Sequence, residues 1–369
     1  TGGQQVELPD DWLINGNVWE MPAAEDAVDI QFEGKVVARE FEGRTIFGLE
    51  GGRTVEAVPY DMPVVGHEAG TVNSLRMWRA RSKAAMDFSA FSNGDYRNAT
   101  LEQDLATVIS KVLYPEDNHY EGKTLRLSQH YFLASATLQH ALRDFKRRWG
   151  NDWALLPEKV VFHINDTHPG FAIPELMRLL MDQEHLGWDE AQQITMRCMA
   201  YTNHTVMQEA LERWPQDLVR RQLPRIYMIL EEMNRRLCDM LWNKFPGDWD
   251  RIGHMAILAN DQVHMANLCV AWSYSVNGVS RLHGDILKKD TFRDYYRLTP
   301  DKFGYVTNGI THRRWLMACN PALTELINQS IGTEWQHDTQ QLDKLLPLRD
   351  DKAFRQAFAK VKDANKERF

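Results

Sequence analysis

The sequence has few cysteines, and none of them are paired at a metal-binding spacing. Cys198, Cys238, Cys269 and Cys319 stand far apart, and no Cys-x-x-Cys occurs. This spacing indicates neither a zinc cage nor a disulfide framework, so a reducing, cytoplasmic location is expected. Long apolar runs are also missing, and no segment has the length of a membrane span or the pattern of a signal peptide. We therefore expect no membrane partner.

Several catalytic signatures are absent as well. The chain contains no Gly-x-Ser-x-Gly of a serine hydrolase and no Gly-x-Gly-x-x-Gly or Walker phosphate loop. Its net charge of −8 argues against a nucleic-acid partner. With 369 residues, the chain is long enough for two domains or for one large α/β unit.

Two apolar segments each end in a polar, titratable turn. Residues 160–164 run into Asn-Asp-Thr-His at 165–168, and residues 200–202 run into Asn-His-Thr at 203–205. Ligands of open α/β sheets bind beyond the carboxyl ends of parallel strands. The pattern therefore predicts a cleft built from the loops after parallel strands, with helices as the crossovers.

The remaining segments divide into a strand-rich part and a helical part. Residues 1–98 read as an irregular, strand-rich insertion, in which 28–32 alternates and 44–49 is expected to pair with 54–58. Pro59, Pro63 and Gly66 then predict a loop. Helices are expected at 99–109, 131–149, 172–185 and 189–197, at about 217–240 with a kink or restart at Pro224, and at 262–280.

Two kinds of site fit the polar residues at the strand ends. Asp166 and His168, with His204 and the His-Gly-Asp run at 283–285, suit a metal-dependent hydrolase, although His283 stands in a segment that reads as helix. The cleft is otherwise rich in amide and hydroxyl groups, which suits a polyhydroxylated ligand, since each sugar hydroxyl needs donors and acceptors. These groups belong to Asn118, Asn165, Thr167, Asn203, Thr205 and Asn308.

A series of long motifs, in one order, resembles the α-glucan phosphorylases, the glycogen and maltodextrin phosphorylase family. The motifs are VLYPEDN (112–118), EGKTLRL (121–127), NDTHP (165–169), AIPELM (172–177), YTNHT (201–205), EALERWP (209–215), HMANL (264–268), VNGV (276–279) and TNGIT (307–311). The resemblance covers nearly the whole chain. One departure is His312, which stands where the family usually has proline.

The resemblance implies a Rossmann-like α/β fold within a two-domain GT-B glycosyltransferase architecture. Residues 1–308 would be the latter part of the glucan-binding domain, and 309–369 the junction and first helices of the cofactor domain. The implied reaction is phosphorolysis of terminal α-1,4 bonds of an α-glucan by inorganic phosphate, giving glucose 1-phosphate with retention. The implied cofactor is pyridoxal 5'-phosphate, whose lysine is not expected in this chain, so the chain alone should be inactive and act as a glucan-binding module.

The resemblance also implies roles for single residues. His204, Asn118 and Asn308 would act on the reacting sugar, with the ring of His204 bonding its 6-hydroxyl. Trp315 would sit near the cofactor, and the helix from Tyr96 to Ser110 would form a homodimer contact. The residues implied to bind substrate are Tyr114, Asp117, Arg126, Asp166, His168, Thr205 and Glu209.

Overall fold

The structure is a computed structural model that describes residues 17–113, 115–207 and 210–369. Tyr114 and Glu209, two of the expected substrate-binding residues, lie outside the described residues. The chain divides into two compact units, Thr1–Val306 and Thr307–Phe369, close to the predicted boundary. That these units are parts of two GT-B domains stays a prediction. None of the helices in the described part of the chain has the length and apolar character needed to cross a bilayer.

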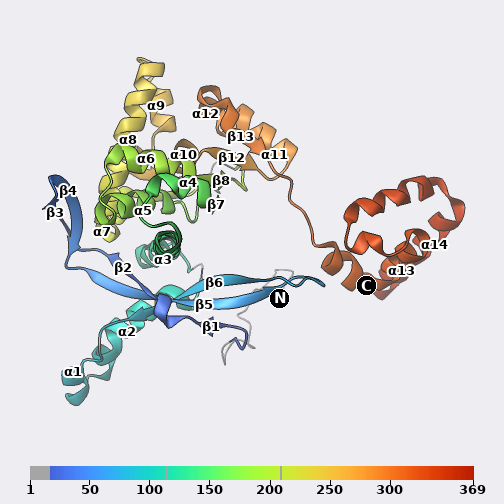
Figure 1. Ribbon diagram of the computed structural model, residues 1–369, viewed down its shortest axis with the longest axis horizontal. Helices are drawn as coiled ribbons and strands as arrows, with labels where there is room; N and C mark the ends of the chain where they lie inside the picture. Colours follow the sequence, from blue (N-terminus) through green and yellow to red (C-terminus); the bar gives the residue numbers. More distant parts are fainter. Residues whose placement is uncertain (1–16, 114, 208–209) are drawn as a thin grey trace. The chain divides into compact units, whose positions relative to one another are not determined.

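The first unit is built around a four-stranded parallel sheet in the order β13-β12-β8-β7 (Figure 1). Its strands are β7 (Phe162–Asn165), β8 (Met199–Thr202), β12 (Ser275–Gly278) and β13 (Phe303–Tyr305). Every residue of β8 is buried, which is typical of a central strand covered on both faces. The predicted α/β class with a parallel sheet and helical crossovers is confirmed.

Helices form the crossovers between these strands. Those between β7 and β8 are α5 (Ala172–Arg178) and α6 (Trp188–Cys198). Those between β8 and β12 are α7 (Gln216–Gln222), α8 (Pro224–Lys244), α9 (Trp249–Met255) and α10 (Met265–Trp272). Those between β12 and β13 are α11 (Arg281–Ile286) and α12 (Arg293–Leu298). Pro224 starts α8 in the first turn, where its missing N–H has no helical partner to lose, so it restarts the helix.

The prediction of one helix over 262–280 was wrong. Only α10 is helical there, and the segment on its carboxyl side is β12, while β11 (Gln262–His264) precedes it. Strand β11 lies between β9 (Arg213–Pro215) and β10 (Leu258–Ala259). The central residue Val276 is fully buried and pairs with strands on both sides, so long-range pairing overrides the local helical pattern.

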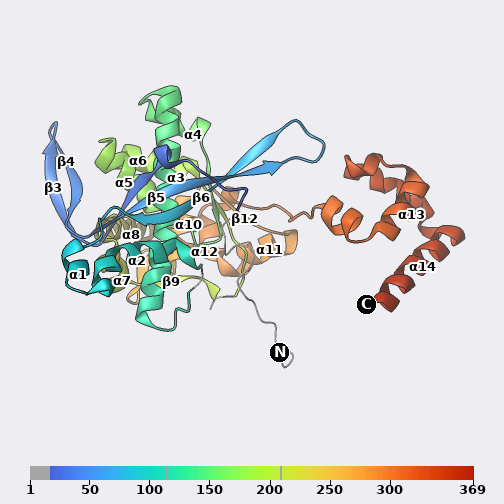
Figure 2. The ribbon, with the colours of Figure 1, turned by 90° about the horizontal axis from the view of Figure 1, so that it is seen from below.

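The strand-rich insertion is present, but its pairing differs from the prediction. Strands β1 (Met21–Pro22), β2 (Val28–Phe32), β5 (Arg53–Val65) and β6 (Val72–Ser82) form one antiparallel sheet, whose long β5–β6 ribbon is seen in Figure 2. Strand β2 alternates buried and exposed residues, as predicted. However, β4 (Arg44–Glu50) pairs with β3 (Lys35–Phe41) rather than with β5.

Strand β5 also continues through the predicted loop. Pro59 and Pro63 both pair with residues of β6. On its other edge, β5 meets β2 up to Ala57 and β1 only at Tyr60 and Asp61. Each proline therefore stands where β5 has one strand neighbour among the described residues, and its missing N–H breaks no ladder.

Three helices join the insertion to the parallel sheet. Helix α1 (Phe88–Ser92) leads into α2 (Tyr96–Lys111), and α3 (Tyr120–Trp149) packs against α5 and β2. Helix α3 begins at Tyr120 rather than at the predicted Tyr131, because the His119 ring accepts a hydrogen bond from the Gly122 amide and caps it. The second unit is helical, as predicted, and its α-helices include α13 (Pro321–Ile331) and α14 (Lys352–Arg368).

Candidate functional site

The loop that follows β7 is fixed against the end of β8. Asp166 adopts the left-handed conformation (φ 61°), which aspartate tolerates better than most residues. Its backbone N–H donates to the Thr202 carbonyl (2.9 Å), and its carboxylate accepts from the Thr167 amide (2.7 Å). The two predicted strand ends therefore meet at one edge of the sheet.

Asn203 is a fully buried hub at this edge. Its Oδ1 accepts from His283 Nε2 and from the Thr205 amide (both 3.0 Å), and its Nδ2 donates to the Tyr201 hydroxyl (3.0 Å). The Val279 amide donates to His283 Nδ1 (3.2 Å), so the ring carries its proton on Nε2. Burial lowers the pKa of His283, which favours this neutral form. Asn203 thus fixes the turn that presents Thr205.

His204, which follows Asn203, is exposed, and its ring is held by a contact with Asn165. Its Nε2 lies 2.5 Å from Asn165 Oδ1, an atom that can only accept. The ring therefore donates from Nε2, and Nδ1 is the acceptor atom of the neutral imidazole. His204 stands at the end of β8, as predicted, and His283 lies in helix α11, as its sequence indicated.

A second cluster surrounds the carboxylate of Glu212, just before β9. Its Oε1 lies 3.5 Å from His130 Nδ1, 3.7 Å from His168 Nδ1 and 3.9 Å from Arg126 Nη2. The Glu212 side chain is 10% exposed, and neither of its oxygens has a hydrogen-bond partner among the described residues. Helix α3 supplies Arg126 and His130, and the loop after β7 supplies His168.

The charges of this cluster are set by burial and by its members. Burial raises the pKa of Glu212, but the attraction of His168, His130 and Arg126 outweighs burial and leaves the pKa lowered. The Glu212 carboxylate raises the pKa of His168. Burial lowers the pKa of His130 to about 4. At neutral pH the cluster therefore holds a carboxylate next to a neutral His130.

Arg126, His168 and Glu212 of this cluster line a pocket of about 630 Å³. Three of the predicted substrate-binding residues, Asp117, Arg126 and His168, line this pocket with Glu212. Asp117 accepts a 2.7 Å hydrogen bond from Arg126, and a fourth predicted residue, Asp166, lies 4.0 Å from His168 Nε2. The structure therefore brings these four predicted residues together.

Other predicted residues belong to other segments of the chain. Asn118 is exposed in the loop before α3, and its amide donates to Glu116 (2.7 Å) rather than to a residue of the strand ends. Asn308 and Trp315 are exposed residues of the second unit. In the second unit, His312 stands where the family usually has proline. Its Nε2 donates a hydrogen bond to the Gln336 carbonyl (2.9 Å).

Sequence reasoning missed Glu212, His130 and Asn277, and it considered His283 only as part of a metal site. Glu212 and His130 form the buried cluster, while His283 and Asn277 hold the strand-end turns, Asn277 by accepting from the Thr202 hydroxyl (2.8 Å). The misread helix over 262–280 concealed Asn277. Nothing in the local sequence of α3 distinguishes His130 as a site residue. Glu212, in contrast, stands in the EALERWP motif (209–215), from which Glu209 was predicted to bind substrate.

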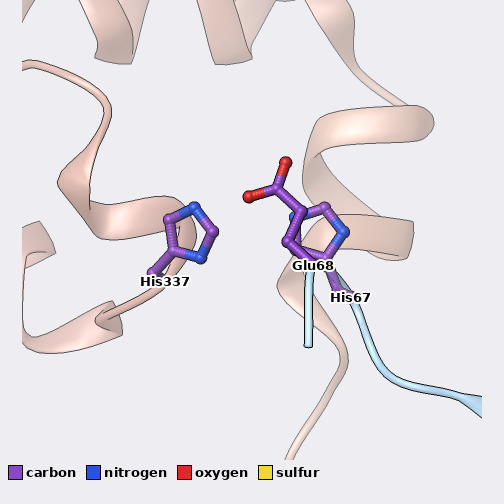
Figure 3. Close-up of side chains that lie close together, drawn as sticks. All are labelled: His67, Glu68 and His337. Carbon is purple, nitrogen blue, oxygen red and sulfur yellow. The ribbon is translucent and has the colours of Figure 1, made fainter. Parts of the chain in front are cut away.

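One further group of metal-binding residue types is not treated as a site. His67 and Glu68 lie in the turn between β5 and β6 of the first unit, whereas His337 follows a short helix of the second (Figure 3). Because these residues belong to different units, we propose no metal site from them.

Comparison with known proteins gives one consistent result. The family model described as carbohydrate phosphorylase matches residues 1–369. The chain is 47% identical, over 99% of its length, to the glycogen phosphorylase of Bacillus subtilis (strain 168), and covers 45% of that protein. It is 46% identical to the muscle form of Oryctolagus cuniculus and to the brain form of Mus musculus, over 100% of the chain and 44% of each relative. The chain thus spans less than half the length of these relatives.

Proposed function

The chain belongs to the carbohydrate phosphorylase family, and on this premise we propose that the protein carrying it phosphorolyses α-glucans. It would cleave the terminal α-1,4 bond of glycogen or maltodextrin with inorganic phosphate and release glucose 1-phosphate with retention. The observation that carries the proposal is 47% identity over 99% of the chain to a glycogen phosphorylase. A cytoplasmic location fits the same proposal.

We assign His204 to the reacting sugar. Its Nε2 is engaged by Asn165, so Nδ1 is the ring atom that would accept a hydrogen bond from a sugar hydroxyl. The carbonyl of His204 would face the positive charge that develops on the sugar ring. Thr205 would bind the same sugar from the turn that Asn203 fixes. Asn118 and, from the second unit, Asn308 would bind further hydroxyls.

The Glu212 pocket would bind the acceptor side of the glucan. Asp117, Arg126, Asp166 and His168 offer charged donors and acceptors there, which suit hydroxyl groups. Tyr114 and Glu209, outside the described residues, are proposed for the same side.

The described residues do not provide a complete site for the family's cofactor. Phosphorylases depend on pyridoxal phosphate, whose phosphate group relays a proton when bound. Burial lowers the pKa of Lys302 to about 8, but its ammonium donates to the carbonyls of Val270 and Ala271 (3.1 Å each) and so caps α10. We propose that Trp315 contacts the cofactor in the full-length protein.

A second candidate function applies to the chain taken alone. The 630 Å³ pocket lies entirely within the first unit, which favours glucan binding without catalysis by this chain. Binding of maltoheptaose by the 369-residue chain, without release of glucose 1-phosphate, is the expected result.

The full-length protein tests the main proposal directly. Purified protein loaded with pyridoxal phosphate is incubated with maltoheptaose, with and without inorganic phosphate, after dialysis against a chelator. Shortening of the glucan should require phosphate and survive the chelator. Shortening that proceeds without phosphate, or that the chelator abolishes, would instead support the metal-dependent hydrolase.

A further inference from the structure

We propose that His130, His168 and Glu212 bind a divalent transition-metal ion such as Zn²⁺. One ligand atom from each residue lies within 4.8 Å of the other two. The residues come from α3, from the loop that hydrogen bonds hold against β8, and from the residue before β9, so separate elements converge on one point. A set of two imidazoles and one carboxylate is a common protein site for zinc.

The distances fit an ion better than they fit hydrogen bonds. Two ligand atoms at about 2.0–2.1 Å from a tetrahedral ion lie about 3.3 Å apart. Glu212 Oε1 is 3.5 Å from His130 Nδ1 and 3.7 Å from His168 Nδ1. Hydrogen bonds between nitrogen and oxygen are mostly about 2.7–3.2 Å long. Closing these gaps around an ion requires side-chain shifts of a few tenths of an ångström.

The burial of unpaired polar atoms points independently to a ligand. His130 is 9% exposed and Glu212 is 10% exposed, yet His130 Nδ1 and both oxygens of Glu212 have no hydrogen-bond partner among the described residues. Such atoms are costly to bury unless something satisfies them. An ion at this point satisfies all of them, and the 39% exposure of His168 leaves the pocket side open for a water ligand.

Charge and ligand type select the class of ion. Arg126 Nη2 lies 3.9 Å from Glu212 Oε1 and opposes any cation, although Asp117 accepts its Nη1 at 2.7 Å. Mg²⁺ and Ca²⁺ prefer several oxygen ligands, and this site offers one carboxylate. Imidazole nitrogens favour zinc, cobalt, nickel and copper. The site is therefore expected to prefer Zn²⁺ and Co²⁺ over Mg²⁺.

Cobalt absorption tests the site without an activity assay. Full-length, metal-stripped protein is titrated with Co²⁺, whose visible bands report tetrahedral coordination, and Zn²⁺ is then added in competition. We expect one equivalent of Co²⁺, displaced by Zn²⁺, and at least about tenfold weaker binding in Glu212→Gln and His168→Gln. The exposed His254→Gln serves as the control and should bind like the wild type. Absence of cobalt bands, or unchanged affinity in His168→Gln, whose side chain is only half-buried and should not affect folding, would overturn the proposal.

A consequence for glucan binding rests on the proposed function. His168 cannot bind the ion and an acceptor sugar with the same atom, so Zn²⁺ should inhibit phosphorolysis in competition with the glucan, and His168→Gln should relieve this inhibition. If Co²⁺ binds and the protein lacks phosphorolysis, the proposed function fails and the metal site stands. If phosphorolysis occurs and Co²⁺ does not bind, the metal site fails alone.

Discussion

At the scale of single residues, the ring of His204 offers substrate one acceptor atom rather than a base activated by a carboxylate. In the full-length protein, His204→Ala should remove the hydrogen bond that we propose between this ring and the sugar, which is worth about 1–3 kcal/mol in a closed site. The expected loss in kcat/KM is one to two powers of ten. A general base would cost about 10²–10⁴-fold. Steady-state phosphorolysis of maltoheptaose measures the difference, with the exposed His254→Ala as control. A mutant as fast as the wild type would remove the role given to His204.

His283 should make the stability of the fold depend on pH. Burial lowers its folded pKa below 6.5, and protonation of Nδ1 would also break the bond from the Val279 amide. Between the folded pKa and 6.5 the unfolded chain binds more protons, so stability is full above pH 6.5 and falls as the pH falls. In His283→Gln the slope of unfolding free energy against pH should decrease by up to about 1.4 kcal/mol per pH unit.

Urea unfolding of the full-length protein and of His283→Gln between pH 5 and 7 measures this slope. Other partly buried histidines, such as His140 and His264, also have lowered pKa values, so some pH dependence should remain in the variant. Equal slopes for the two proteins would show that His283 is not the titrating group.

Single residues differ in how far the sequence alone could place them. Asp166, His168 and His204 could be predicted, because a polar turn directly after an apolar strand is a local signal. Glu212 and His130 could not, because their meeting depends on how α3 packs against the sheet, which no local pattern records.

At the scale of elements, Gly122 fixes the loop that carries Asp117. A Cβ on Gly122 would lie 1.8 Å from the Glu116 carbonyl oxygen, so Gly122→Ala must displace this loop. Alanine favours a helix over glycine by about 0.5–1 kcal/mol, yet this gain cannot offset so close a contact. We expect the variant to weaken maltoheptaose binding by about tenfold, the effect of losing the Asp117–Arg126 pair.

Gly187→Ala is the matched control for Gly122→Ala, because its added Cβ meets no atom within 4 Å. Calorimetric titration of both variants with maltoheptaose separates the loop from a general glycine effect. If the two variants bind equally, the loop before α3 does not shape the pocket.

The elements also show where prediction from sequence ends. The alternation of β2 and the apolar runs of β7 and β8 predicted strands correctly, since burial acts on each strand locally. The partner of β4 and the strand β12 were predicted wrongly, because pairing partners are chosen by the whole sheet. The length of β5 was not predicted, because Pro59 and Pro63 indicate a loop. That both prolines pair with β6 on one side of β5 is seen only in the assembled sheet.

At the scale of the whole molecule, we propose that an apolar row on α2 forms the homodimer contact that the family resemblance implies. Tyr96, Leu101, Leu105 and Val108 are exposed on a helix whose other face buries Ala99, Ala106 and Ile109. Burying such a row against a second copy would be favourable. Leu101→Glu with Leu105→Glu should convert the full-length protein from dimer to monomer in light scattering.

Leu346→Glu, which alters an exposed leucine of the second unit, is the control for that experiment and should leave the dimer intact. A wild-type protein that is monomeric at high concentration, or a dimer that survives the double change on α2, would place the contact elsewhere or remove it.

The central claim is that phosphate, not water, receives the glucosyl group and that the configuration is retained. Nuclear magnetic resonance of phosphorus and protons, recorded while the full-length protein acts on maltoheptaose in phosphate buffer, observes both at once. We predict loss of inorganic phosphate matched by growth of α-glucose 1-phosphate. Free glucose with unchanged inorganic phosphate, or a β-configured sugar phosphate, would contradict it.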